Sequence, residues 1–271
     1  MQNILLIFLL GGALFYSRKI YRFILFYITK NQYDFYGIQK HQQIRHMELE
    51  AMFEQEFHYF KSLSPKARTK FLARLWHVYN KVEFFGYGEL TIQENMKLRV
   101  LFSQIQLTFG LRHYYFKNFK KYILYPTAFY SNYFERDLKG LTSNAGFITL
   151  SWANFELGYD EHFDKFNLGL HEMAHAFRLH IANASFTFNL TQLHIDFDKI
   201  AKAEMFMAER GVPSILRDYA LTNHEEFFAV CIEYFFEAPE LLKNTLPKIF
   251  YSLCSILNQN PLNHNKDYRI N

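Results

Sequence analysis

The sequence has little cysteine, proline or glycine. Its two cysteines, Cys231 and Cys254, are too few for a disulfide framework and do not indicate an oxidising compartment. Six prolines and 11 glycines exclude a collagen-like or low-complexity chain. Neither positive nor negative charge dominates, because the chain has 30 Lys and Arg and 26 Asp and Glu. The resulting net charge of +4 is too small to indicate a nucleic-acid-binding protein.

Apolar and aromatic side chains are abundant instead. Half of the 271 residues are hydrophobic, and 31 Phe and 19 Tyr contribute most of the 19% that are aromatic. This is ample material for a buried core in which aromatic rings dominate the packing. The composition therefore predicts a folded protein.

The N-terminal segment, residues 1–30, is the most apolar part of the chain. Residues 4–16 carry no charge, and further apolar residues follow the basic side chains at positions 18, 19 and 22. A membrane anchor, an interfacial helix and a buried helix are the three alternatives, and we favour the single-pass anchor. Basic residues on its C-terminal side would then place the body of the protein in the cytoplasm, at the cell membrane.

The remaining chain predicts one α+β domain that is mainly helical, over residues 31–262, followed by a polar tail at 263–271. Helices are expected at about 65–81 and 91–110, and strand-like β-branched and aromatic runs lie at 122–125 and 147–152. Everything after residue 163 has helical patterning, apart from an irregular link at about 211–223.

The segment LGLHEMAHAF, residues 168–177, carries the pattern with the most chemical content. His171 and His175 are four apart, so on a helix their imidazoles project from one face, one turn apart. Two imidazoles at this spacing can bind one zinc ion, and Glu172 between them can reach water at that ion as a general base. A pair of polar helix residues facing solvent is the alternative.

A catalytic zinc site needs a third protein ligand. The extended motif HExxHxxGxxH is excluded, because Arg178 and Ile181 stand where it requires glycine and histidine. Downstream, Glu225 and Glu226 open a predicted helix with Thr222 as its cap in a capping box. An acid in a first turn also complements the helix dipole, so the residues alone do not decide whether either acid is a ligand.

HEMAH followed by DYALTNHEEFFAVCIEYFFEAPELL resembles the Mlc titration factor A family of zinc metallopeptidases. The resemblance extends through LSPKARTKFLARL, ILYPTAF and GFITLSW upstream, and through LPKIFYSLCSILNQNPL downstream, so it covers about residues 63–262. It implies a zincin-like fold, distantly similar to the catalytic domain of anthrax lethal factor. It also implies one zinc ion, bound through HExxH and a distant glutamate.

Carried over by position, the resemblance implies that His171, His175 and Glu226 bind the metal. The third ligand is then the second acid of the pair, Glu226. Glu172 takes the role of general base, and Tyr219, seven residues before Glu226, that of a hydroxyl that stabilises the oxyanion.

Two further features have both a functional and a structural interpretation, and the sequence does not decide between them. Glu233 either hydrogen-bonds a ligand histidine or serves the polar side of a packed helix. The strand at residues 147–152 is either an edge strand, which could pair with an extended peptide, or an interior strand.

The function expected from the sequence is zinc-dependent hydrolysis of peptide bonds, either aminopeptidase-like or oligopeptide-cleaving. Its partners would be a peptide or protein substrate and a protein regulator, without nucleic acid. The alternative is a regulatory module that binds and sequesters a partner such as a transcriptional regulator, with incidental hydrolysis.

Overall fold

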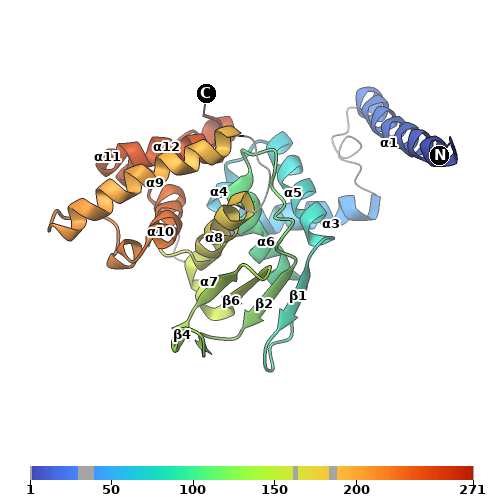
Figure 1. Ribbon diagram of the computed structural model, residues 1–271. Coiled ribbons are helices and arrows are strands. Elements are labelled where there is room, and N and C mark those ends of the chain that lie inside the picture. The colour runs from blue at the N-terminus through green and yellow to red at the C-terminus, as the bar shows by residue number, and fades with distance from the viewer. Residues whose placement is uncertain (1, 30–39, 161–163, 183–187, 271) are drawn as a thin grey trace. The chain divides into compact units, whose positions relative to one another are not determined.

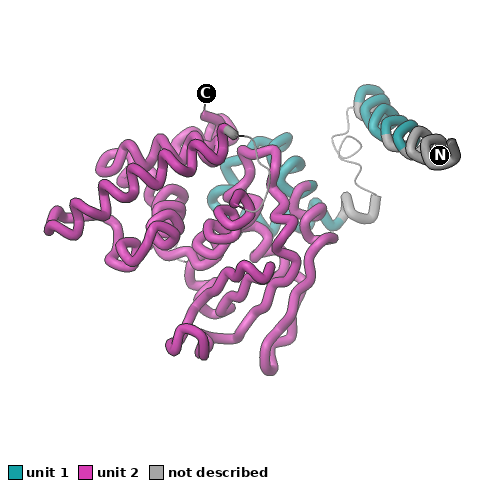
Figure 2. The backbone as a smooth tube through the Cα atoms, viewed as in Figure 1, with its two compact units in different colours: residues 1–73 teal, residues 74–271 magenta. Residues whose placement is uncertain are grey.

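The computed structural model describes residues 2–29, 40–160, 164–182 and 188–270. The chain forms two compact units, residues 1–73 and 74–271 (Figure 2). The single domain expected over residues 31–262 spans this division and stays a prediction. Every residue of the predicted site lies in the second unit.

Helix α1 occupies Gln2–Thr29 (Figure 1). Its apolar run covers residues 4–16, and Arg18, Lys19 and Arg22 follow soon after it, whereas a bilayer span needs about 20 apolar residues. In the part of the chain that the structure describes, no helix combines the length and apolar character that a membrane crossing requires. The expectation of a single-pass anchor with a cytoplasmic body is therefore wrong.

The other elements that the structure describes in the first unit are helices. They are α3 (Lys40–Glu56), α4 (His58–Lys61) and the start of α5 (Pro65–Tyr79). Helix α5 begins as its sequence predicts, with proline in the first turn and the Ser64 hydroxyl accepting a hydrogen bond from the Ala67 N–H. Buried rings that meet edge to face form the centre of this unit: Phe53, Phe57, Phe60 and Phe71.

A four-stranded mixed sheet opens the second unit, in the order β1-β2-β6-β5. Its strands are β1 (Glu83–Gly86), β2 (Lys121–Tyr125), β5 (Gly140–Ser143) and β6 (Phe147–Ser151). Strands β1, β2 and β6 run parallel, and β5 pairs antiparallel to β6. The strands expected at 122–125 and 147–152 are thus confirmed. The second of them, β6, is interior, so the sheet edge on its side is β5.

A separate two-stranded hairpin, β3 and β4, directly precedes β5 in the chain. Strand β3 spans Phe129–Ser131 and β4 spans Arg136–Leu138, paired antiparallel.

Helices make up most of the remaining chain, which confirms the mainly helical α+β class (Figure 1). Helix α6 starts at Glu94, with Gln93 as its N-cap. After the end of α5, the described helices of this unit are α6 (Glu94–Thr108), α7 (Trp152–Asp160), α8 (Leu168–Ala182), α9 (Phe188–Glu209), α10 (His224–Glu237), α11 (Pro239–Thr245) and α12 (Pro247–Leu257), with short 3-10 turns η1 (Asp218–Leu221) and η2 (His264–Lys266).

Helix α8 lies at the centre of the second unit, in contact with α6, α10 and strands β5 and β6. Its apolar side chains are buried nearly all round: Leu170, Met173, Ala174, Ala176 and Phe177. A helix that is buried on most sides holds its few polar side chains in defined positions, because close-packed neighbours leave no room for other rotamers. The HEMAH segment is on this helix.

Gly169, in the first turn of α8, is packed closely against α6 and α7. A Cβ there would clash with the Ser103 hydroxyl of α6 and lie 2.7 Å from the Phe155 ring. Alanine normally stabilises a helix relative to glycine, but overpacking a core costs about 1–3 kcal/mol.

We therefore expect Gly169→Ala to lower the free energy of unfolding by about 1–3 kcal/mol, measured by urea denaturation. The matched control is Gly12→Ala on α1, where a Cβ meets nothing within 4 Å and no loss is expected. Unchanged or increased stability of Gly169→Ala would contradict the close packing of α8.

Candidate metal centre

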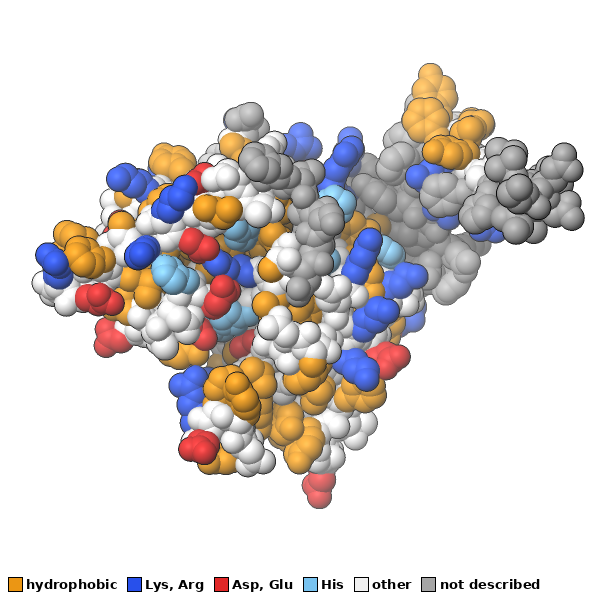
Figure 3. Space-filling view, viewed as in Figure 1, with side chains coloured by type: hydrophobic (Ala, Val, Ile, Leu, Met, Phe, Trp, Pro, Cys, Tyr) orange, Lys and Arg blue, Asp and Glu red, His pale blue; other side chains and the backbone are white. Residues whose placement is uncertain are grey.

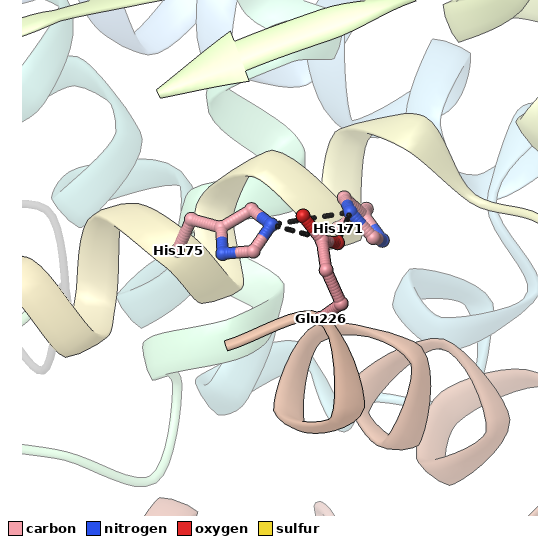
Figure 4. A group of neighbouring side chains, drawn as sticks. All are labelled: His171, His175 and Glu226. Carbon is pink, nitrogen blue, oxygen red and sulfur yellow. Dashed lines mark hydrogen bonds and ion pairs between the residues drawn. The ribbon is translucent and has the colours of Figure 1, made fainter. Parts of the chain in front are cut away.

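Three potential ligands converge between α8 and α10 (Figure 4). His171 and His175 project from one face of α8, and Glu226 reaches them from the first turn of α10. The two Nε2 atoms are 3.2 Å apart, and the Glu226 Oε2 lies 3.0 Å from that of His171 and 3.4 Å from that of His175. The two histidines, four residues apart, therefore bring their imidazoles together, as the sequence predicts. The packing of α10 against α8 brings the Glu226 carboxylate to them.

These separations fit one bound cation. Nitrogen and oxygen ligands lie about 2.0–2.1 Å from zinc, so two ligands in a tetrahedral site are about 3.3 Å apart. All three observed distances are close to this value, and the donors are the two imidazoles and one carboxylate typical of open zinc sites. Among the described residues, this is the one group of His, Cys, Asp and Glu side chains close enough to hold a metal.

The electrostatics of the three ligands show how strongly they interact. Burial disfavours the charged imidazole of His171, but hydrogen bonds to Glu226 and Glu233 outweigh it and raise the pKa of His171 to about 10. Burial likewise disfavours the Glu226 carboxylate, yet His171 and His175 hold its pKa well below the usual range. Positive charge between these groups is therefore strongly favoured.

The start of α10 positions Glu226. Asn223 is the N-cap, and its side-chain oxygen accepts a hydrogen bond of 2.9 Å from the Glu226 N–H. The cap expected at Thr222 is thus one residue too early, and the Thr222 hydroxyl instead donates to the Tyr219 carbonyl. Asparagine is as good an N-cap as threonine, so propensity alone could not choose between neighbouring residues.

Glu233, two turns along α10, hydrogen-bonds His171. Its Oε1 is 2.7 Å from His171 Nδ1, and the side chain is almost fully buried. This contact leaves Nε2 of His171 facing Glu226 and His175. A carboxylate on the far nitrogen fixes the ring orientation and tautomer of a metal-binding histidine.

Two residues that the sequence analysis missed complete this arrangement. The Asn167 N–H donates to Glu233 Oε2 at 2.7 Å, and its side-chain oxygen accepts from the Leu170 N–H, which caps α8. The guanidinium of Arg217 donates to Glu233 Oε1. Asn167, standing just before the HEMAH helix, carried an N-cap signal; nothing in the local pattern pointed to Arg217.

Glu172 lies beside the three ligands and is buried, with only 4% of its surface exposed. Burial raises its pKa, while the charges of His175 and His171 and a hydrogen bond from Thr142 oppose this rise. The Thr142 hydroxyl on β5 is 2.8 Å from Glu172 Oε2. A raised pKa makes a carboxylate a better proton acceptor than a solvated one.

Tyr219 stands on the turn η1 with its ring tilted over that of His171, at 6.0 Å between centroids. It is 39% exposed. Burial of the hydroxyl, followed by the charge of Glu226, raises the pKa of Tyr219 to about 12. The phenol therefore keeps its proton at neutral pH and remains a hydrogen-bond donor.

Glu225, the neighbour of Glu226, points elsewhere. Its Oε2 pairs with Arg178 Nε at 2.9 Å, and the same guanidinium binds Asp198 of α9 through two hydrogen bonds. The fold thus separates the two adjacent acids, one toward the histidines and one toward an ion pair on the outside of α8.

The fold and this site define a metallopeptidase-type centre, with HExxH on a buried helix and a third acid on a second helix. Comparison with known proteins agrees. The profile of the glucose-regulated metallo-peptidase M90 family matches residues 30–257, and the chain belongs to this family. A metallopeptidase family implies a bound metal.

Relatives in this comparison share the name Mlc titration factor A. The protein from Yersinia enterocolitica is 29% identical over 197 residues, which cover 64% of this chain and 70% of the relative. The protein from Escherichia fergusonii is 27% identical over 195 residues, covering 64% and 71%. These matches confirm the resemblance on which the positions of Glu226 and Tyr219 were assigned.

The assignment of the third ligand leads to a paired prediction. Glu226→Ala should weaken zinc binding by more than the ~10–100-fold that loss of an outer partner costs, because it removes a direct ligand. Glu225→Ala is the matched control and should bind zinc as the wild type does, since it loses only a half-exposed ion pair. Competition with a chromophoric chelator measures both affinities, and equal affinities would contradict Glu226 as the ligand.

Proposed function

We propose that this protein is a zinc-dependent peptidase, with His171, His175 and Glu226 as the metal ligands. The observation that supports this most is the convergence of these three groups beside the buried carboxylate of Glu172. When bound there, zinc would polarise the scissile carbonyl and acidify water. The remaining tasks, proton transfer, oxyanion stabilisation and substrate alignment, fall to side chains and backbone of this chain.

Glu172 moves the proton. Its carboxylate accepts a proton from water as the water attacks the carbonyl carbon, and then delivers it to the nitrogen of the leaving amine. Burial supports this role because it raises the pKa of Glu172 and so makes the carboxylate a better base than a solvated one.

Tyr219 stabilises negative charge on the former carbonyl oxygen. Its phenol is protonated at neutral pH and can donate a hydrogen bond to an oxygen that becomes negative in the transition state. The ring lies beside His171, at the half-exposed side of the site.

An extended peptide is the substrate shape that fits the site. Strand β5 is an edge of the sheet and contacts α8, so its free backbone groups can pair with a peptide beside the three ligands. The hairpin that leads into β5 exposes three aromatic side chains, Tyr130, Tyr133 and Phe134. Hydrophobic side chains gather on the surface at the lower end of the molecule in Figure 3. These surfaces favour a peptide with apolar side chains.

A second candidate function is suggested by the relatives' name, which describes them as factors that titrate Mlc. On this alternative the present protein binds a regulatory protein stoichiometrically and hydrolysis is incidental. The presence of Glu172 argues for the first function, because this carboxylate binds no metal and its position beside the ligands serves proton transfer.

The test is cleavage of a mixed peptide pool by the zinc-loaded full-length protein and by its Glu172→Gln variant. We expect the wild type to cut and the variant to lose at least ~100-fold in rate, since a glutamine cannot accept the proton. Mass spectrometry of the products distinguishes trimming of the N-terminus from internal cleavage.

Zinc content measured on the same two samples is the control. If both hold one zinc ion and neither cuts any peptide, hydrolysis is not the function and stoichiometric binding of a regulator becomes the better account. Equal cutting by both would remove Glu172 from the mechanism.

A further inference from the structure

Strand β5 does more than form a sheet edge, because it contacts the Glu172 side chain at two points. Residues two apart on a strand face the same side, so Gly140 and Thr142 both face α8. The Thr142 hydroxyl lies 2.8 Å from Glu172 Oε2 and 3.0 Å from the Glu172 backbone oxygen. A single hydroxyl thus links the carboxylate to its own main chain.

Gly140 closes the other side of the carboxylate. A Cβ at this position would clash with Glu172 Oε1 and lie 2.7 Å from both Cδ and Cγ. Real Cβ atoms essentially never come so close to a neighbour, so any larger residue would displace the carboxylate. The Glu172 side chain therefore packs directly against the backbone of β5 at Gly140.

From these contacts we infer that Gly140 and Thr142 are positioning residues that set where the Glu172 carboxylate stands relative to the metal ligands. This inference rests on the proposed function and deepens it. One strand would then serve two purposes, since its inner face holds the base and its free edge aligns the peptide. Strand β5 would then determine the distance between the Glu172 carboxylate and the scissile bond of the peptide.

The sheet register offers a matched control. Thr149 on β6 pairs with Leu141 and not with Gly140 or Thr142, so its side chain is on the opposite face of the sheet from Glu172. It is also buried. Thr149→Val therefore makes the same chemical change as Thr142→Val in the same sheet, without touching the carboxylate.

The experiment compares steady-state peptide hydrolysis by four zinc-loaded full-length proteins: the wild type, Thr142→Val, Thr142→Ser and Thr149→Val. Valine keeps the shape and strand preference of threonine, so Thr142→Val should fold and hold zinc normally. We expect its kcat to fall about 10–100-fold, with KM within about twofold, because a misplaced base costs rate and not binding. Thr142→Ser, which keeps the hydroxyl, and Thr149→Val should both retain the wild-type kcat.

Two kinetic results would overturn the inference: a wild-type kcat in Thr142→Val, or an equal loss in Thr142→Ser. Crystal structures of the zinc-loaded wild type and Thr142→Val decide it independently of activity. The inference requires the Glu172 carboxylate to contact Thr142 in the wild type and to shift in the variant, and an unmoved carboxylate contradicts it. If the wild type cuts no peptide, the proposed function fails, while the two structures still decide the role of Thr142.

Discussion

The arrangement of the site depends on one buried carboxylate. Glu233 is 1% exposed and lies between α8 and α10, where it is bound by His171 Nδ1, the Asn167 N–H and the Arg217 guanidinium. A buried carboxylate is tolerated only when its oxygens are paired, and breaking such a pair by removing one partner costs about 3–5 kcal/mol. The contacts with His171 and with Asn167, the cap of α8, therefore fix the start of α8 against α10, and that placement brings Glu226 to within hydrogen-bond distance of His171.

The sheet constrains the same helix from its other side. Strand β5 contacts the carboxylate of Glu172 through Thr142, while α6 approaches α8 so closely at Gly169 that a methyl group would not fit. His171, Glu172 and His175 are thus on a helix that packed neighbours hold on several sides. Tyr219, on a 3-10 turn and partly exposed, is the group on the solvent side. A rigid set of ligands with one accessible face is what hydrolysis of an incoming chain requires.

The sequence predicted those features that follow from local periodicity. Histidines four apart on an apolar helix must share a face, and the β-branched runs became β2 and β6. What it could not supply are contacts between distant segments. The contact of Thr142 with Glu172 spans 30 residues and that of Glu233 with His171 spans 62, and neither leaves a local pattern. Edge and interior strands look alike in sequence, so the position of β6 inside the sheet could not be predicted. Strand β5 was not predicted at all, because it is short and half-buried and so has no marked apolar pattern. The prediction of a membrane anchor at the N-terminus was wrong for a different reason. An uncharged apolar run is typical of a membrane segment, but basic residues follow it too early for a span.

The proposed function requires His171, His175 and Glu226 together to hold one zinc ion in an open site. X-ray absorption at the zinc edge of the full-length protein, loaded with one equivalent of zinc, examines this site itself. We expect a first shell of nitrogen and oxygen atoms at about 2.0–2.1 Å, with two imidazoles and no sulfur. In His175→Ala the scattering should change to that of a single imidazole. A sulfur shell at about 2.3 Å, or a spectrum that His175→Ala leaves unchanged, would contradict the account.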